Sequence, residues 1–309
     1  MARGVAILAM VVYHFTWDLS FLRLIATNIV VEPGWQWFAR AIAGSFLFLV
    51  GIGLVLAHAR GFRRAPFLRR LAKIGGAALA VTAATFFAFP DSYIFFGILH
   101  CIAVSSALAL PFLRAPRVVT ALAALFSVAA PWLFTDPALD HPLLDWLGLG
   151  QALPRTNDYV PIFPWFGLVL LGILAGRMLL EREQTLSVAR WRASGRVFGA
   201  LKFAGRKSLP IYLVHQPVLL ALLYGVLLAT GPNPAAESRP FIRECRMSCL
   251  ENNGNAATCE ALCDCAVDRL RESGLWPDIA AGRAGPADQG RISDVAQQCL
   301  RRVAPPERP

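Results

Sequence analysis

The first apolar stretch, GVAILAMVVYHFTWDLSFLRL at residues 4–24, carries a histidine and an aspartate inside a segment long enough to cross a lipid bilayer. A membrane-spanning helix needs about 20 predominantly apolar residues. Six more such stretches follow, at 40–58, 71–89, 93–112, 117–134, 160–180 and 209–229. Only 16% of the residues are charged, whereas about a quarter are charged in soluble domains. The sequence therefore predicts an all-α, polytopic membrane protein with about seven transmembrane helices.

The chain of 309 residues divides by composition into four parts. Residues 1–230 contain the apolar stretches, and residues 231–240, rich in proline and small polar residues, are expected to be a linker. Residues 241–303 are expected to form a small disulfide-stapled helical module, and 304–309 a disordered end. Within the first part, the basic and apolar segment 181–207 is expected to lie in the membrane interface as a helix.

The net charge of +10 is distributed as expected for a membrane protein rather than for a protein that binds nucleic acid. With the N-terminus inside, the inner loops hold 17 basic residues, whereas the outer loops hold only Arg23, Arg40 and Arg155. An excess of basic residues marks the cytoplasmic side, where they meet anionic membrane lipids. We therefore expect a cytoplasmic N-terminus and, after seven crossings, an external C-terminal tail. We find no cleavable signal peptide, and we expect residues upstream of Met1, because the first span begins directly after MARG.

Cysteines concentrate in the tail, which contains six of the seven: Cys245, Cys249, Cys259, Cys263, Cys265 and Cys299. An even number of cysteines in a short exported segment indicates a disulfide framework. Two C-x3-C pairs on facing helices favour nested bridges, Cys245 to Cys263 and Cys249 to Cys259, which leaves Cys265 for Cys299. This is one of 15 possible connectivities. A metal site is the alternative, although the tail contains no histidine, and we expect no metal in the protein. The seventh cysteine, Cys101, is expected to be a packing residue.

Three histidines lie inside apolar stretches: His14, His100 and His215. An ionisable side chain in hydrocarbon is costly and is a functional candidate by default. Arg3 and His14 are eleven residues apart, which places them on one face of a helix about 16 Å from each other. That layout would hold a phosphorylated carrier at the guanidinium while its reactive end reaches the imidazole. Asp18, one turn after His14, would either orient the imidazole or cap the outer end of the span.

Polar and aromatic residues also gather at the expected outer ends of two spans. The stretch NDYVPIFPWFG contains Asp158, Tyr159 and Trp165 beside two prolines, and GWQWFARAIAGSF contains Trp35, Trp37 and Arg40. Such residues suit the binding of a polar acceptor such as a sugar. They are equally typical of the aromatic belt at a membrane interface.

Five stretches together resemble a known family over residues 3–220: ARGVAILAMVVYHFTWDL, FARAIAGSFLFLVGIGL, FFGILHCIAVSSALALPF, DYVPIFPWFGLVLLGILAG and GRKSLPIYLVHQPVL. Their order and spacing resemble bacterial members of the heparan-α-glucosaminide N-acetyltransferase catalytic-domain family, formerly a domain of unknown function. The spacing of Arg3 and His14 is also similar to that of the integral-membrane acyltransferases that O-acetylate envelope polysaccharides.

The resemblance implies an acyltransferase of the bacterial inner membrane. It would move an acetyl or other acyl group from cytoplasmic acyl-CoA, such as acetyl-CoA, to a glycan or amino sugar at the periplasmic face. Arg3 would then hold a CoA phosphate, and His14 would carry the acyl group or act as the general base. Asp18 would orient His14, while His100 and His215 would have supporting roles.

The chain departs from the family at one point, and other functions stay open. Lysosomal-type members place their active histidine in the outer loop after the first span, whereas residues 23–40 contain no histidine here. A proton-coupled transporter or flippase of a small polar or lipid-linked substrate is one alternative, with histidines relaying protons. A scaffold whose tail binds a periplasmic partner is another. A homo-oligomer is compatible with all three.

Overall fold

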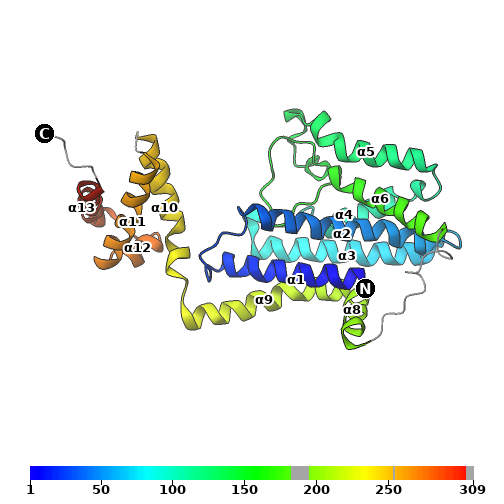
Figure 1. The fold of residues 1–309 in the computed structure, drawn as a ribbon, viewed down its shortest axis with the longest axis horizontal. Coiled ribbons are helices and arrows are strands. Elements are labelled where there is room, and N and C mark those ends of the chain that lie inside the picture. Colours follow the sequence, from blue (N-terminus) through cyan, green and yellow to red (C-terminus); the bar gives the residue numbers. More distant parts are fainter. Residues whose placement is uncertain (182–194, 253–254, 304–309) are drawn as a thin grey trace. The chain divides into compact units, whose positions relative to one another are not determined.

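The computed structural model describes residues 1–181, 195–252 and 255–303, and all regular elements in these ranges are helices (Figure 1). The chain divides into two compact units. Unit 1 comprises Met1–Phe15 and Val30–Leu219, and unit 2 comprises Thr16–Ile29 and Leu220–Pro309. Helices α1 (Ala2–Phe21) and α9 (Ser208–Thr230) each contribute residues to both units.

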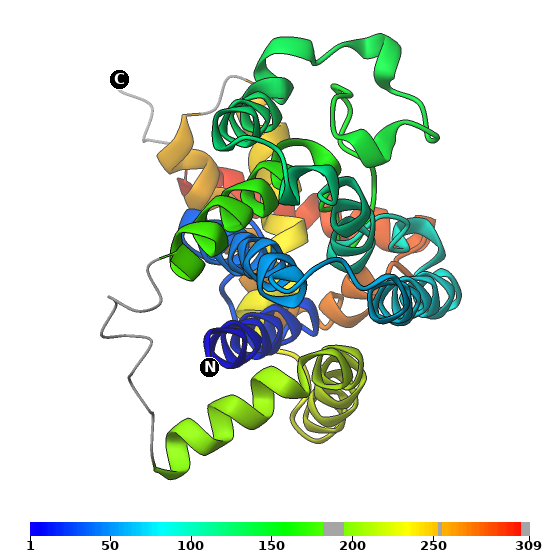
Figure 2. The same ribbon diagram turned by 90° about the vertical axis from the view of Figure 1, so that its right-hand side faces the viewer.

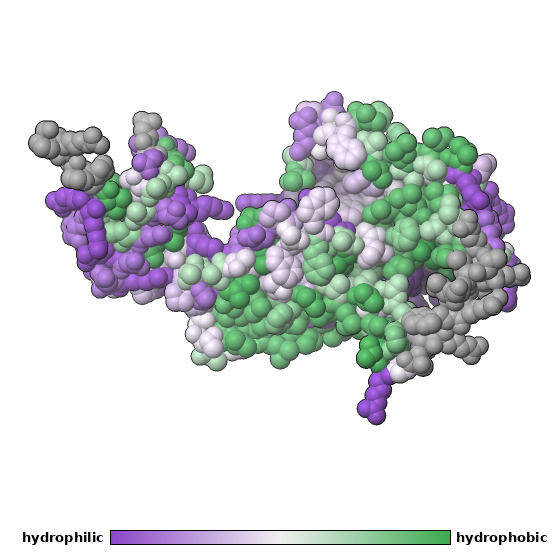
Figure 3. All heavy atoms as spheres, in the orientation of Figure 1, coloured by the Kyte–Doolittle hydropathy of each residue, from purple (hydrophilic) through white to green (hydrophobic). Residues whose placement is uncertain are grey.

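Unit 1 is a bundle of apolar helices, several of which are seen nearly end-on in Figure 2. It contains the first part of α1 and of α9 together with α2 (Pro33–His58), α3 (Arg64–Ala88), α4 (Ile98–Leu108), α5 (Arg117–Phe134), α6 (Ile162–Glu181) and α8 (Arg196–Arg206). Among the described residues, six helices are long and apolar enough to cross a membrane: α1, α2, α3, α5, α6 and α9. Apolar side chains cover much of the visible surface of these helices (Figure 3). The chain is therefore a multi-pass membrane protein, as predicted.

The fourth predicted span, 93–112, differs from the other six. Its helix α4 has only 11 residues and is followed by the short 3₁₀ helix η2 (Pro111–Leu113). The helix starts after Gly97, and proline explains why it ends, since proline has no N–H and disrupts a helix interior. Pro90 opens the 3₁₀ helix η1 (Pro90–Ser92) before α4, and Pro111 opens η2 after it.

This short helix nevertheless leads the chain from one side of the bundle to the other. The segment before α4 is tied to the loop 135–161 that joins α5 to α6, because the Val160 N–H donates to the Phe96 carbonyl. The far end of α6 carries Glu181, which forms an ion pair with Arg117 at the start of α5. Residues 98–116 thus run from the side of the loop to the opposite side. We conclude that α4 and η2 make a seventh, short traversal.

Helices α2 and α6 approach each other so closely that their backbones touch. A Cβ placed on Gly172 of α6 would overlap with the backbone oxygen of Phe48, and one on Gly51 of α2 would overlap with the backbone oxygen of Val169. Small residues permit such contact between helices in a membrane, where dispersion replaces the hydrophobic effect as the driving force. Leu47 of α2 is fully buried in the main apolar core.

The described residues of unit 2 include four helices after α9, three of which are joined by disulfides. The four helices are α10 (Pro234–Glu251), α11 (Ala256–Glu272), α12 (Trp276–Ala280) and α13 (Pro286–Val303), and the disulfides join α10, α11 and α13. The bonds join Cys245 to Cys263, Cys249 to Cys259, and Cys265 to Cys299. These are the three pairs that the sequence favoured. A small apolar core around Trp276 completes the unit.

The predicted linker is partly helical, whereas the predicted C-terminal end is not among the described residues. The predicted linker 231–240 is helical from Pro234, because the Asn233 side chain accepts hydrogen bonds from the N–H groups of Ala235 and Ala236. Asparagine is a favourable N-cap, and proline suits the first helical position. The predicted disordered end, 304–309, lies outside the described residues, as do residues 182–194 of the predicted interface helix 181–207, of which Arg196–Arg206 forms α8.

We expect Gly172→Ala to lower the apparent melting temperature of the protein in detergent. The added methyl group must push α2 and α6 apart, and overpacking of this kind costs about 1–3 kcal/mol. Gly75→Ala on α3 is the matched control, because a Cβ there meets no atom within 4 Å. Scanning fluorimetry compares the two variants. Equal melting temperatures would contradict the close approach of α2 to α6.

Candidate functional site

Two of the three histidines in apolar stretches meet in unit 1. The ring centroids of His14 on α1 and His215 on α9 lie 4.9 Å apart, with their planes at 66°. The Nδ1 atom of His14 and the Nε2 atom of His215 are both buried, and neither has a hydrogen-bond partner among the described residues. A buried polar atom without a partner is costly, so such atoms mark a place for a ligand or for chemistry.

The hydrogen bond of His215 determines which of its nitrogens carries the proton. Its Nδ1 atom lies 2.7 Å from the carbonyl oxygen of Tyr212. A carbonyl oxygen can only accept, so Nδ1 donates, and the neutral ring keeps the lone pair on Nε2. His215 therefore presents a free basic nitrogen inside the bundle.

His100, by contrast, uses both ring nitrogens. Its Nδ1 accepts from the Gly97 N–H at 3.3 Å, and its Nε2 lies 3.2 Å from the hydroxyl oxygen of Thr82. The Thr82 hydroxyl donates its own proton to the Ile94 carbonyl at 2.7 Å, so His100 Nε2 must donate to Thr82. These bonds attach α3 to the start of α4. A catalytic part for His100 stays a prediction.

Asp158 caps the start of α4. Its Oδ2 accepts the Ile98 N–H at 2.9 Å, where the partial positive charge of the helix N-terminus favours a carboxylate. Only glycine fits at position 97, because a Cβ there would overlap with this carboxylate. Burial raises the pKa of Asp158 to about 6, and the bond from Ile98 opposes part of that rise.

The Asp158 carboxylate also connects α4 to the histidine pair through two tyrosines. It acts electrostatically on the hydroxyls of Tyr13 and Tyr212. The Tyr13 ring packs against His14 at 5.6 Å, and the Tyr212 ring against His215 at 5.8 Å. No sequence signal predicts Tyr13 at this site, because Tyr13 is adjacent to His14 and adjacent residues on a helix point about 100° apart.

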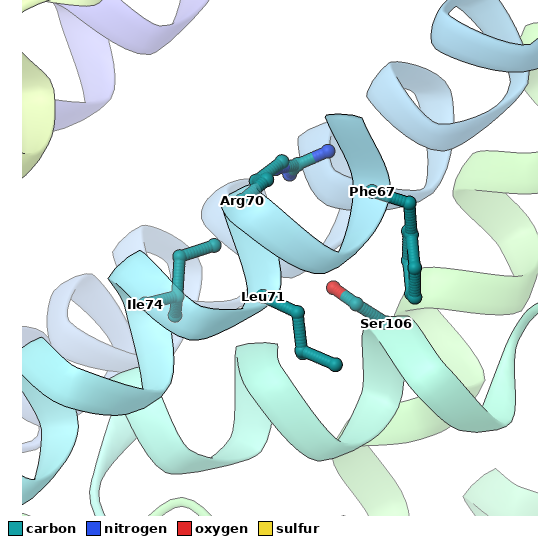
Figure 4. Close-up of a pocket in the computed structure, with 5 residues that line it drawn as sticks. All are labelled: Phe67, Arg70, Leu71, Ile74 and Ser106. Carbon is teal, nitrogen blue, oxygen red and sulfur yellow. The ribbon is translucent and has the colours of Figure 1, made fainter. Parts of the chain in front are cut away.

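A second part of unit 1 gathers positive charge. The Arg3 guanidinium lies against Gly53 of α2, where a Cβ would come within 2.9 Å of Nη2. Arg3 interacts electrostatically with Arg70 of α3, and neither forms an ion pair with a described carboxylate. Arg70 lines a narrow recess toward which Ser106 of α4 points (Figure 4). Two neighbouring guanidinium groups suit phosphate oxygens. The basic run from Arg60 to Lys73 is the only sequence signal for Arg70.

The other predicted acceptor residues make contacts of their own. Arg40 is exposed and lies over the ring of Trp37 at 5.3 Å. The Tyr159 hydroxyl donates to the Asp145 carbonyl at 2.6 Å, and burial together with Asp145 raises the pKa of Tyr159 to about 12. Trp165 packs at the edge of the main apolar core. Their part in acceptor binding stays a prediction.

Asp18 belongs to unit 2 and is fully buried, and its orientation of His14 stays a prediction. In the described ranges, no group of three or more histidine, cysteine, aspartate or glutamate side chains is arranged to hold a metal ion.

We expect Asp158→Asn to flatten the pH dependence of the apparent melting temperature between about pH 4 and pH 6. In the folded protein Asp158 keeps its proton up to a pKa of about 6, whereas an unfolded chain releases it near pH 3.9. The folded state thus binds more protons in this window, and stability falls as the pH rises through it. The amide of the variant does not titrate but still accepts from Ile98. Exposed Asp91→Asn serves as the control, and an unchanged slope in the Asp158 variant would refute the assignment.

Residues 1–217 match the protein family described as heparan-alpha-glucosaminide N-acetyltransferase, catalytic. No curated protein and no solved structure matches the chain. The matched range covers more than two thirds of the 309 residues and includes Arg3, His14, Asp158 and His215. The chain therefore belongs to the heparan-α-glucosaminide N-acetyltransferase catalytic-domain family.

Proposed function

We propose that this protein is an acyl-CoA-dependent membrane acetyltransferase that acts on a glycan or an amino sugar at the periplasmic face. The observation that carries the proposal is the buried pair of His14 and His215, each with a ring nitrogen that lacks a partner among the described residues. Membership of an acetyltransferase family supports the class of reaction.

The arrangement along α1 supports acetyl-CoA as the donor. Helix α1 is continuous from Ala2 to Phe21, so Arg3 and His14 lie on one face about 16 Å apart. Arg3 and Arg70 would bind phosphates of CoA through charge-assisted hydrogen bonds. The flexible arm of CoA would then carry the thioester along α1 to the histidine pair.

The histidine pair would supply a base for the transfer. The acceptor nitrogen or oxygen forms a bond to the acetyl carbonyl carbon, and the bond from that carbon to the sulfur of CoA breaks. One imidazole takes the proton that the acceptor loses, and the proton returns to the thiolate of CoA. His215 is suited to the first step because its Nε2 holds a free lone pair. General base catalysis of this kind contributes roughly 10²–10⁴-fold to the rate.

Charge and disulfides support the orientation. Basic residues concentrate on the inner loops, which favours a cytoplasmic N-terminus in the inner membrane of a bacterium. Disulfides persist in oxidising compartments, so the three bonds of unit 2 favour a periplasmic tail. Within the described ranges, six long apolar helices and the short α4 make seven traversals, which agrees with termini on opposite sides.

We expect purified protein in detergent to release CoA from acetyl-CoA when glucosamine is supplied as acceptor. His14→Ala and His215→Ala should each lower the rate at least about 100-fold, because each removes part of the proton path. His141→Ala is the control, because His141 is exposed in the loop that joins α5 to α6. CoA release is followed with a thiol reagent, and the melting temperature confirms folding. Wild-type activity in both histidine variants, or no CoA release by the wild type with any amino sugar or oligosaccharide acceptor, would refute the proposal.

A further inference from the structure

A groove lies in unit 1 between α1 and the start of α2, and it is lined by none of the residues of the histidine site. Its volume is about 550 Å³, and its walls are formed by Val12, Glu32, Gly34, Trp35 and Phe38. A volume of this size lies within the range of small-molecule binding sites. The walls combine apolar and aromatic surface with one carboxylate.

Ring contacts connect the groove to the histidine pair without interruption. Trp35 and Phe38 lie 5.8 Å apart, and they pack against Tyr13 at 6.3 and 6.4 Å. Tyr13 in turn packs against His14 at 5.6 Å. Tyr13 therefore links the two aromatic walls of the groove to His14.

The chemistry of the walls favours a sugar ring over a lipid. A pyranose has an apolar face of C–H groups that packs on aromatic side chains, and hydroxyls around its edge that donate to a carboxylate. An acyl chain would desolvate Glu32 without giving it a hydrogen bond. An anionic headgroup would be repelled by the charge of Glu32.

We propose that this groove binds the sugar ring of the acceptor and that Glu32 selects against anionic sugars. Trp35 and Phe38 form the platform on which the ring lies, and Glu32 accepts hydrogen bonds from its hydroxyl or ammonium groups. As the place where the acceptor waits for acetyl transfer, the groove rests on the proposed function. Its binding of sugar requires no turnover and is tested without acetyl-CoA.

Trp37, which lies two residues after Trp35 on α2, offers a matched control for Trp35. Trp35 is half-buried and lines the groove, whereas Trp37 is 68% exposed and lies under the Arg40 guanidinium. Both are tryptophans in the first turns of α2, so their replacement changes the helix equally. Only Trp35→Ala removes a wall of the groove.

The test measures equilibrium binding to the full-length protein in detergent, without acetyl-CoA. The probes are a glucosamine disaccharide, which is cationic, and a glucuronic acid disaccharide, which is anionic. We expect Trp35→Ala to weaken binding of the glucosamine disaccharide at least about tenfold, through loss of aromatic contact, and Trp37→Ala to change it less than about twofold. Trp35→Phe should retain most of the affinity, which guards against a folding defect. Glu32→Gln should raise the affinity for the anionic disaccharide relative to the cationic one.

Several outcomes would overturn the inference. These are no binding of either disaccharide by the wild type, equal weakening by Trp35→Ala and Trp37→Ala, and an unchanged preference in Glu32→Gln. If Trp35→Ala instead reduces the amount of co-purified phospholipid and leaves sugar binding intact, the groove holds lipid. Sugar binding that depends on Trp35 in a protein that releases no CoA would support the groove and refute the transferase. If the protein releases CoA but its sugar binding does not depend on Trp35, the transferase is supported and the groove is refuted as the sugar site.

Discussion

Hydrocarbon cannot hydrogen-bond, so the polar groups of this protein must find partners within the chain. Unit 1 follows this constraint closely. Ser106 donates to the Ile102 carbonyl at 2.6 Å, His58 Nδ1 lies 2.8 Å from the Leu54 carbonyl, and His100 uses both ring nitrogens. The pair of His14 and His215 departs from this pattern, because each ring keeps a buried nitrogen without a described partner. The buried Nδ1 of His14 and Nε2 of His215 therefore identify the candidate site.

The close packing of α2 against α6 has consequences far from the contact. With α6 pressed on α2 at Gly51 and Gly172, the loop 135–161 that precedes α6 lies over the start of α4. The Val160 N–H then donates to Phe96, and Asp158 reaches Ile98. A carboxylate from this loop thereby enters the electrostatic surroundings of Tyr13 and Tyr212. The backbone contact of two helices thus helps bring the Asp158 carboxyl within electrostatic range of the tyrosines that pack against the two histidines.

The first helix of the chain serves each part of the proposed reaction. Arg3 lies near its beginning, beside Gly53 and within electrostatic range of Arg70. Val12 lines the groove, Tyr13 packs against Trp35, and His14 meets His215. Because a helix is stiff over this length, α1 would hold the proposed donor, the reacting groups and the proposed acceptor in a fixed order. One apolar helix, α1, therefore carries several of the residues on which the proposed reaction depends.

Local spacing alone determined much about this protein. Runs of about 20 apolar residues indicate helices in a membrane, the spacing of Arg3 and His14 places them on one face, and two C-x3-C pairs favour the bridges that form. Helical periodicity states which residues share a face, but not which helix that face meets. Only the tertiary structure therefore paired His14 with His215, occupied both nitrogens of His100, and placed Asp158 at the start of α4. It also showed that the fourth helix starts after Gly97 and ends before Pro111, and that α10 starts at Pro234 after the Asn233 cap. These features depend on contacts between segments distant in sequence, or on caps of single residues, and neither leaves a periodic signal.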